Sequence, residues 1–238
     1  MIEPRTPRVI KPESKPSNFC PGCGYGIILK TLGQVIDEME IAPRTVFGID
    51  IGCNLLAWDY FNLDTIQTHH GRVTPTIAGY KRSQKESVVI GLAGDGGLYA
   101  IGLQSLLHTA HRDEAVTVIG VNNTLYAMTG GQAAPTTTYR EVTDTTPDGE
   151  FTNKRPFLGP ELVSDVAEKG AFIARASVNN IPDMKAKMKK AIEAQLAGHF
   201  ALLEIISYCP TNWGTDAKKT IEFTDKLAET YKLGVISE

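Results

Sequence analysis

Three glycines and two polar side chains form the most informative pattern in this chain. Gly94, Gly96 and Gly97 surround Asp95 directly after an apolar run, and Asn123 follows the next apolar run. Glycine has no Cβ, so it lets the backbone turn sharply and lets a bulky anion approach closely. Asp95 and Asn123 offer the oxygen ligands that a hard octahedral ion such as Mg²⁺ prefers. The pattern therefore predicts a cation-dependent diphosphate site.

The segments around these residues predict the elements that hold them. Apolar runs at 87–93 and 115–121 favour buried strands, and residues 98–112 carry apolar side chains at helical spacing. The helix would begin at the glycine turn, where free N–H groups and the helix dipole favour an anion. Gly-Asp-Gly alone is an ordinary turn and Asn-Asn an ordinary strand exit. Their combination in this order is what indicates a site.

Strands and helices continue to alternate along the chain. We expect helices over 27–40, 162–169 and 182–197, and further strands over 46–51, 172–176 and 200–207. Such alternation predicts an α/β fold with a mostly parallel sheet and helices on both faces. The segment 133–160, rich in Thr, Pro and Gly, interrupts the pattern. A loop of that length predicts a functional segment or one buried against another chain.

The composition is that of a soluble globular protein with one sizeable core. The chain has 238 residues, of which 42% are hydrophobic and 21% charged, and its formal net charge is −3. This charge and the lack of a basic cluster argue against nucleic acid as a partner. No apolar run reaches membrane-spanning length, and the first residues lack the apolar core of a secretion signal. We expect a cytoplasmic protein with no membrane partner.

Four cysteines form the second informative set. Cys20 and Cys23 have the Cys-x-x-Cys spacing, and Cys53 and Cys209 complete the set. Four is the number of thiolates in one closed tetrathiolate site. Disulfides are disfavoured because a cytosol keeps thiols reduced. Spacing alone leaves both a structural zinc ion and a [4Fe-4S] cluster open.

Six motifs occur in unbroken order between Ser17 and Gly214. They are Phe19-Cys-Pro-Gly-Cys-Gly24, Ile51-Gly-Cys-Asn54, His70-Gly71-Arg72, Gly94-Asp-Gly-Gly97, Asn122-Asn-Thr-Leu-Tyr-Ala-Met-Thr-Gly-Gly-Gln132 and Cys209-Pro-Thr-Asn-Trp-Gly214. Together they resemble the β subunit of 2-oxoacid:ferredoxin oxidoreductases. The last motif and the tail at 231–236 are most similar to the branched-chain (2-oxoisovalerate) branch of that family.

The resemblance implies a thiamin diphosphate-binding fold with a site on three loops. Mg²⁺ would be held by Asp95, Asn123 and the backbone carbonyl of Leu125. Thiamin diphosphate would contact Ile51, Gly52, Cys53, Asn54, His70, Gly96, Gly97, Ala127 and Met128. A [4Fe-4S] cluster would be held by Cys20, Cys23, Cys53 and Cys209. The resemblance favours this cluster over zinc, because the carbanion formed on thiamin is a strong reductant that needs a nearby electron acceptor.

The same resemblance implies an activity and a set of partners. A 2-oxoacid would be oxidatively decarboxylated with coenzyme A to acyl-CoA and CO₂, and electrons would pass through the cluster to ferredoxin. The carboxylate that activates the thiamin pyrimidine is expected on the α subunit, so we assign no catalytic residue to this chain and expect it to be inactive alone. A γ subunit and a ferredoxin-like δ subunit are further expected partners in this heteromer.

The domain organisation follows from the same features. Four prolines in the first sixteen residues predict an extended N-terminal arm, 1–16, that lies on a partner. Residues 17–214 would form the domain that binds thiamin diphosphate and the cluster. Residues 215–238 would form a tail packed on the domain or on a partner.

Three positions distinguish this chain within the family pattern. Many members have Asp where Gly97 stands and Gly where Ala127 stands, but neither change removes an inferred side-chain ligand. Relatives that act on 2-oxoglutarate place a basic residue near the position of Leu56, and here residues 55–58 are apolar. Burying a second carboxylate there without a partner would be unfavourable, so a branched or aromatic 2-oxoacid is favoured.

Two alternatives share part of this pattern. A thiamin-dependent lyase or carboligase subunit with a structural zinc ion would keep the Asp95 and Asn123 site but contain no iron. A non-catalytic electron-transfer subunit would hold a cluster and bind no thiamin diphosphate.

Overall fold

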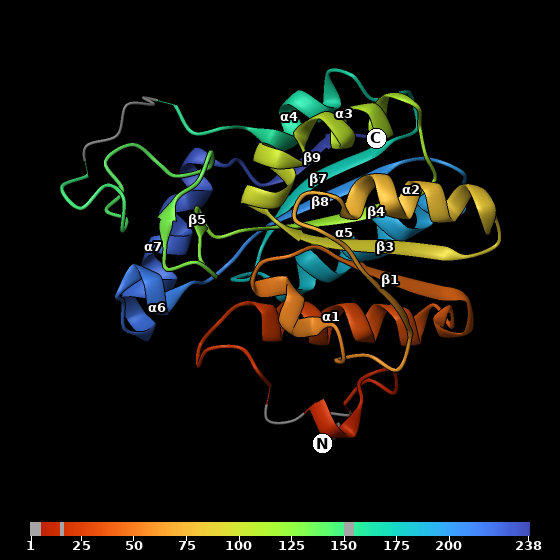
Figure 1. The fold of residues 1–238 in the computed structure, drawn as a ribbon, viewed down its shortest axis with the longest axis horizontal. Coiled ribbons are helices and arrows are strands. Elements are labelled where there is room, and N and C mark those ends of the chain that lie inside the picture. The colour runs from red at the N-terminus through yellow and green to blue at the C-terminus, as the bar shows by residue number, and fades with distance from the viewer. Residues whose placement is uncertain (1–5, 15–16, 150–154) are drawn as a thin grey trace.

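A seven-stranded sheet with the order β2-β1-β3-β4-β8-β7-β9 forms the centre of this computed structural model (Figure 1). The structure describes residues 6–14, 17–149 and 155–238. The strands pair in parallel from β2 across to β7, and β9 joins the edge of β7 in the antiparallel sense. The expected α/β fold with a mostly parallel sheet is confirmed.

The central strands are buried along their length. The strands of the sheet are β1 Thr45–Ile49, β2 Asp64–Gln67, β3 Val88–Gly94, β4 Thr117–Asn122, β7 Phe172–Ser177, β8 Ala201–Ile206 and β9 Gly234–Ser237. A second, two-stranded sheet joins β5 Leu125–Tyr126 and β6 Gln132–Ala133. Burial on both faces explains why β3 and β4 are almost entirely apolar in the sequence and why β7 and β8 each contain only one charged residue, Arg175 and Glu204. The short, partly exposed β2 and β9 lack such an apolar run, and the sequence did not predict them.

Seven α-helices and four short helices surround the sheet within the described residues. The α-helices are α1 Tyr25–Glu38, α2 Val73–Ser83, α3 Leu103–His111, α4 Gly159–Ser164, α5 Ile181–Leu196, α6 Pro210–Trp213 and α7 Ala217–Thr230. The short helices are η1 Pro12–Ser14, η2 Ala42–Arg44, η3 Cys53–Ala57 and η4 Gly97–Ile101. The helix expected over 162–169 instead begins at Gly159, because Pro160 suits a first turn. The sequence did not predict α2 and α7, whose buried faces are short and contain several threonines.

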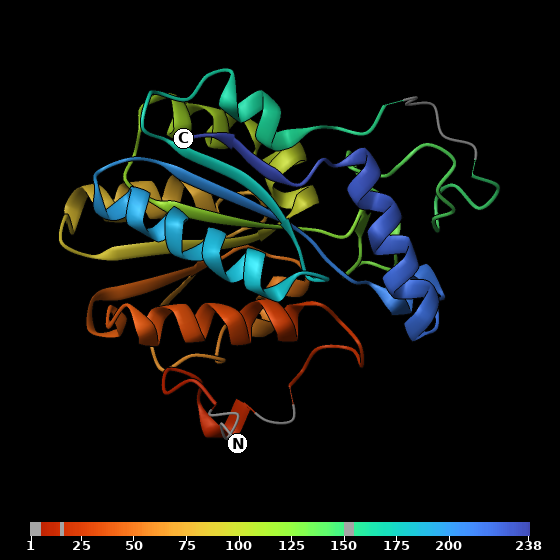
Figure 2. The ribbon, with the colours of Figure 1, turned by 180° about the vertical axis from the view of Figure 1, so that it is seen from behind.

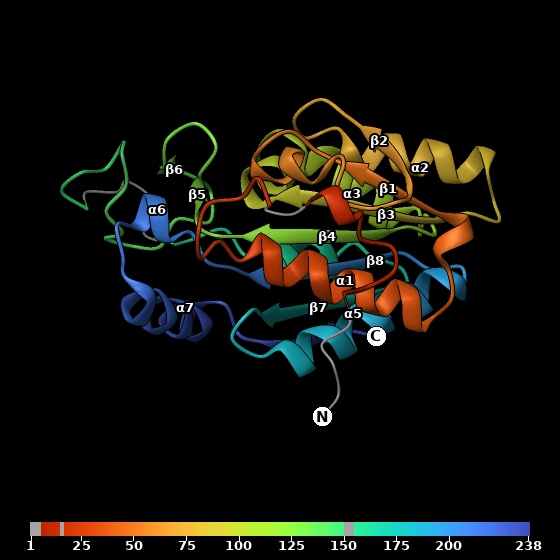
Figure 3. The ribbon, with the colours of Figure 1, turned by 90° about the horizontal axis from the view of Figure 1, so that it is seen from below.

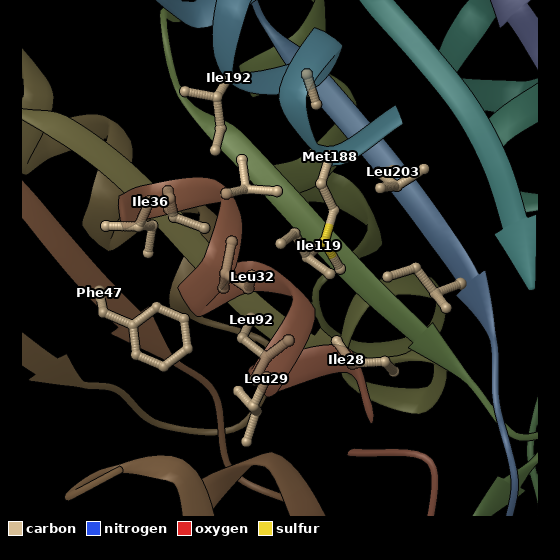
Figure 4. Packing of buried hydrophobic residues seen from close by; sticks show 14 of the residues in the cluster. Ile28, Leu29, Leu32, Ile36, Phe47, Leu92, Ile119, Met188, Ile192 and Leu203 are labelled. Carbon is tan, nitrogen blue, oxygen red and sulfur yellow. The ribbon is translucent and has the colours of Figure 1, made fainter. Parts of the chain in front are cut away.

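The helices cover both faces of the sheet, as expected. In Figure 2, α1 and α5 lie in front of the sheet, and their apolar side chains form one core with alternate strand residues such as Ile90 and Leu92. Figure 4 shows this core from close by, including Leu32 of α1 and Met188 of α5. On the opposite face, α2, α3 and α4 pack on the intervening strand residues, including Val89. The two-residue alternation of a strand thus divides the side chains between two cores.

Several segments gather at one end of the sheet. The parallel strands β1, β3, β4 and β8 all end at the same edge, and α6, α7, β5 and β6 lie beyond it (Figures 1 and 3). The C-terminal segment packs on the domain through the buried Leu227 and Tyr231, and its last strand pairs with β7. The carboxyl ends of parallel strands are the usual place for a ligand in such folds.

The described part of the N-terminal arm, 6–14, packs on the chain's own domain. Val9 and Ile10 are buried in the core with α1, and Ile10 forms a β-bridge with Phe61. The rest of the arm lies outside the described residues. The apolar side chains of residues 9 and 10 are therefore buried within this chain. The contact of the arm with a partner stays a prediction. Within the described ranges, no helix is both long enough and apolar enough to span a membrane.

Candidate cofactor site

A cavity of about 250 Å³ opens at the carboxyl ends of β1, β3 and β4. Every residue that the sequence predicted to contact thiamin diphosphate or its metal ion lies on its wall. These residues are Ile51, Gly52, Cys53, Asn54, His70, Asp95, Gly96, Gly97, Asn123, Leu125, Ala127 and Met128. The wall also includes Gly94 of the predicted glycine turn. The remaining wall residues were not singled out by the sequence and are Tyr25, Val121, Tyr126 and Thr129. Residues from distant parts of the chain thus meet around one space.

The glycine turn after β3 leads directly into a helix. Gly102 N–H donates to Gly97 O at 2.9 Å across five residues, so the predicted helix over 98–112 begins with the π-helical turn η4 before it continues as α3. Such π-turns are frequent at functional sites. A Cβ on Gly96 would lie 2.2 Å from the Tyr126 ring, and one on Gly97 would lie 2.1 Å from Asp50 Oδ2. Side chains already fill the space around both glycines.

Asp95 is a buried carboxylate that lacks a cationic partner among the described residues. It is 2% exposed, its Oδ1 accepts from Gly96 N–H at 2.9 Å, and its Oδ2 accepts from the Thr136 hydroxyl. Burial raises its pKa to about 7, and these hydrogen bonds offset the rise only in part. A buried carboxylate of this kind is stabilised by a bound cation. Its environment therefore fits a magnesium ligand.

The turn after β4 brings Asn123 and Leu125 to the same cavity. Between them, Thr124 has φ of +64°, which is unusual for a β-branched residue. Asn122 Oδ1 accepts from Thr124 N–H at 3.0 Å, and the Thr124 hydroxyl donates to Glu141. Strained backbone of this type persists when its surroundings hold it, and it is concentrated at functional sites. The turn therefore gives Asn123 and Leu125 a defined orientation.

The long loop over 133–160, which the sequence predicted to be functional or buried against another chain, supplies further contacts. The Thr137 hydroxyl donates to Thr124 O at 2.5 Å, and Glu141 Oε2 accepts from Thr138 N–H at 2.9 Å. Burial raises the pKa of Glu141. The sequence analysis did not identify Thr136, Thr137 or Glu141. The feature of the sequence that could have identified these residues is the run of three threonines at 136–138 in a long loop.

A buried ion pair lies behind this turn. The guanidinium of Arg175 contacts Glu204 through Nε, and both residues are fully buried. Arg175 also donates to both oxygens of Glu161 at 2.7 Å. Asn122 Nδ2 lies 3.4 Å from Glu204 Oε1, which connects the pair to the end of β4. The polar groups beneath the site thus form one connected network.

The four cysteines lie on three neighbouring segments. Cys20 and Cys23 precede α1, Cys53 begins η3, and Cys209 precedes α6. The loop before α1 packs tightly on the chain before Cys209, because a Cβ on Gly24 would lie 2.2 Å from the hydroxyl oxygen of residue 207. In α6, Asn212 Nδ2 donates to Ala127 O at 2.9 Å. The Cys209 segment therefore contacts the cofactor cavity's wall directly.

All four cysteines are free thiols. Burial, with smaller contributions from neighbouring thiols, raises the pKa of Cys23 to about 11 and that of Cys53 to about 12. The pKa of Cys209 is raised for the same reasons. No group of three or more His, Cys, Asp or Glu side chains in the described ranges is arranged to hold a metal ion. The donor number and type fit a tetrathiolate site, while the sulfurs are not gathered around one ion position.

Asp50 is a site residue that the sequence analysis missed. We predicted a strand over 46–51, but β1 ends at Ile49, so Asp50 falls in the turn beside the cavity. Asp50 is fully buried, and its Oδ2 lies 3.5 Å from Nδ1 of His70. It also occupies the space beside Gly97 that a Cβ there would enter. The feature of the sequence that could have identified Asp50 is an acidic residue at the end of a predicted buried strand.

Asn54 lines the cavity, but its amide nitrogen mainly supports the backbone. Nδ2 donates to Asp50 O at 2.5 Å, and Oδ1 lies 3.5 Å from the Tyr25 hydroxyl. Tyr25 is buried, stacks on Phe19 and lines the cavity. Ionisation of Cys53 and of Asp95 both raise the pKa of Tyr25, although burial raises it most. Tyr25 therefore lies near both the Cys53 thiol and Asp95.

Comparison with known proteins agrees with this geometry. Residues 50–205 match the family described as "Thiamine pyrophosphate enzyme, C-terminal TPP binding domain". The chain is 38% identical to the ketoisovalerate oxidoreductase subunit VorA of Methanothermobacter marburgensis, over 90% of this chain and 46% of that relative. It is 32% identical to the 2-oxoglutarate synthase subunit KorB of Methanocaldococcus jannaschii, over 87% of this chain and 74% of that relative. The chain thus spans about half the length of VorA.

A solved structure has the same fold. The 2-oxoglutarate:ferredoxin oxidoreductase from Magnetococcus marinus, with 2-oxoglutarate, coenzyme A and succinyl-CoA bound, superimposes with a TM-score of 0.80. The match covers 99% of this chain and 86% of that chain at 22% identity. The chain belongs to the thiamine pyrophosphate enzyme family and, within it, to the subunits of 2-oxoacid:ferredoxin oxidoreductases.

Proposed function

We propose that this chain is the subunit that binds thiamin diphosphate and a [4Fe-4S] cluster in an enzyme that oxidatively decarboxylates a 2-oxoacid. Coenzyme A would receive the acyl group, and ferredoxin would receive the electrons. The observation that supports this best is the single cavity lined by all twelve predicted coenzyme and magnesium residues, with the buried Asp95 among them. No other described carboxylate lines it.

Each part of the cavity has a role in binding. Asp95, Asn123 and the carbonyl of Leu125 would hold Mg²⁺, which prefers oxygen ligands. Gly96 and Gly97 begin a helix, so their backbone N–H groups favour the diphosphate, and His70 would contact the same end. Ile51, Ala127 and Met128 would exclude water from the thiazolium. These residues bind and orient the coenzyme, and none of them is assigned as a proton donor.

The cysteines would hold the cluster beside the coenzyme. Cys53 is well placed for this role because it lines the cavity and belongs to the set of thiols that influence one another. A cluster with several irons needs a wider arrangement of sulfurs than the tetrahedral shell of one zinc ion. A relative at 30% identity is named as the β subunit of a 2-oxoacid:ferredoxin oxidoreductase, and transfer to ferredoxin calls for an electron-carrying group, which supports the cluster over zinc. Bound iron would also stabilise thiolates that burial disfavours.

When bound, thiamin diphosphate supplies the carbanion chemistry of decarboxylation, and the cluster accepts the electrons singly. The chain itself supplies position, charge and a cavity that excludes water. Asp95, the single described carboxylate on the wall, is used for the metal ion, so the carboxylate that activates the pyrimidine would come from the α subunit. The chain alone would then bind only part of the coenzyme, and a γ subunit and a ferredoxin-like δ subunit would complete the complex.

The substrate we propose is a branched-chain 2-oxoacid such as 2-oxoisovalerate. Among the described residues, no Lys or Arg lines the cavity, so this chain offers no cation for a second substrate carboxylate. Leu56 packs partly buried against the core beside Cys53. VorA, named for ketoisovalerate, is also a relative at 38% identity. An apolar environment of this kind favours an apolar substrate side chain.

The test is anaerobic co-purification of the chain with its partner subunits. We expect iron, sulfide, Mg²⁺ and thiamin diphosphate in the complex, and turnover of 2-oxoisovalerate with coenzyme A and a viologen acceptor in a panel of 2-oxoacids. Asp95→Ala should lose the coenzyme, whereas Asp113→Ala, at the opposite end of the sheet, should retain it. Zinc without iron would instead indicate the lyase or carboligase. Turnover by the chain alone would contradict the shared site.

A further inference from the structure

One carboxylate oxygen beside the cavity has no hydrogen-bond partner within the described residues. Asp50 is 0% exposed, and its Oδ2 is buried without a donor. A buried polar atom of this kind is unfavourable unless nearby charge or a ligand compensates for it. Magnesium ligation was assigned to other residues, so the role of Asp50 is open.

Asp50 contacts the turn that carries His70. Its Oδ1 accepts from Gly71 N–H at 2.6 Å, and its Oδ2 lies 3.5 Å from His70 Nδ1. His70 Nδ1 also lies 2.9 Å from Ile51 O. Both neighbours of Nδ1 are acceptors, so Nδ1 carries a hydrogen. Nε2 is then the ring nitrogen left for a ligand in the cavity that His70 lines.

The same carboxylate also abuts the glycine turn. A Cβ on Gly97 would lie 2.1 Å from Asp50 Oδ2 and 3.5 Å from His70 Cε1. Asp50 therefore contacts both turns, and His70 and Gly97 of these turns line the cavity. Acceptors beside one ring nitrogen of a histidine are a recurrent way to direct the other nitrogen at a ligand. Here Ile51 O accepts from Nδ1, and the carboxylate charge of Asp50 lies beside the same nitrogen.

We propose that Asp50 is a positioning residue, which holds His70 and the Gly71 turn so that His70 Nε2 contacts the diphosphate of thiamin diphosphate. This inference rests on the proposed function and extends it to a residue that does not itself line the cavity. Asp50 acts through His70, so the loss of its charge matters only while His70 is present.

The test is a double-mutant cycle in the assembled complex. Asp50→Asn keeps the shape and the Oδ1 acceptor but removes the charge, and His70→Gln removes the ring. After removal of the coenzyme, binding of thiamin diphosphate and of thiamin is measured by calorimetry. We expect each single variant to weaken thiamin diphosphate binding roughly tenfold, with thiamin binding within about twofold of the parent. The double variant should bind no more weakly than His70→Gln.

Asp113→Asn is the matched control. Asp113 Oδ2 lies 2.7 Å from His199 Nδ1, which gives the same pair of groups away from the cavity wall, so this variant should leave coenzyme binding unchanged. Additive losses in the double variant would overturn the proposal, and so would a lower kcat with unchanged affinity. If Asp50→Asn does not fold, the His70→Gln variant tests the proposal by itself. Equal losses of affinity for thiamin and for thiamin diphosphate in that variant would overturn the proposal. A parent complex that binds no thiamin diphosphate would refute the proposed function instead.

Discussion

The hydroxyl of Thr136 donates a hydrogen bond to Asp95 Oδ2, although the two residues are 41 positions apart. Thr136 is fully buried, and its carbonyl accepts from the Tyr231 hydroxyl near the C-terminus. The long loop and the C-terminal segment are thereby connected to the predicted magnesium ligand. Distant segments of the chain thus determine how this carboxylate is presented.

Thr136→Val should weaken magnesium and coenzyme binding while the fold is kept. The valine has nearly the same shape but cannot donate to the carboxylate, and this bond lowers the pKa of Asp95. We expect the affinity at pH 7 to fall about three- to tenfold, measured by calorimetry on the assembled complex. Thr224→Val, which removes a hydroxyl bonded within α7, is the control. Equal affinities in both variants would show that the bond is unimportant.

Magnesium binding to the coenzyme-free complex should strengthen as the pH rises from about 6 to 8. Burial raises the pKa of Asp95 to about 7, and the metal ion binds the deprotonated carboxylate. Binding therefore releases a proton, and the release can be measured by calorimetry in buffers of different ionisation enthalpy. An affinity that is constant over this range would mean that Asp95 is already ionised.

Asp95→Asn should abolish coenzyme retention and yet stabilise the coenzyme-free protein at pH 8. The pKa of Asp95 in the folded protein, about 7, lies above its ordinary value of 3.8. The protonated carboxyl group of Asp95 therefore contributes its full stability below pH 4, and this contribution is lost as the pH rises through 7. The asparagine removes this loss, on the order of 2–4 kcal/mol. Thermal unfolding at pH 5 and pH 8 measures it. If the parent protein had the same thermal unfolding midpoint at pH 5 and at pH 8, the prediction would be contradicted.

Cys209→Ser should lower the iron and sulfide content while thiamin diphosphate remains bound. Cys209 is a predicted cluster ligand, but it does not line the cavity of about 250 Å³. Iron, sulfide and thiamin are quantified after anaerobic purification of the complex. Thr211→Ala on the same short helix, with an exposed side chain, serves as the control. Unchanged iron in Cys209→Ser would remove this cysteine from the ligand set.

Most of the residues on the cavity wall could be predicted because each lies in a short local motif. Glycine turns, a Cys-x-x-Cys pair and an Asn-Asn strand exit are properties of adjacent residues, so they can be recognised before the fold is known. Asp50 was missed because the predicted strand over 46–51 included it, whereas the strand ends at Ile49. Tyr25 and Thr136 were missed because only contacts with distant segments bring them to the site.

The sequence by itself determined the family, the parallel sheet and most of the residues that line the cavity, because apolar runs and glycine turns depend on local chemistry. The tertiary structure decided which groups support those residues. Thr136 reaches Asp95, Asp50 reaches His70, and Thr124 is held at φ of +64° by contacts from other segments. Such contacts depend on how the loops pack at the carboxyl end of the sheet, and no local pattern specifies that packing.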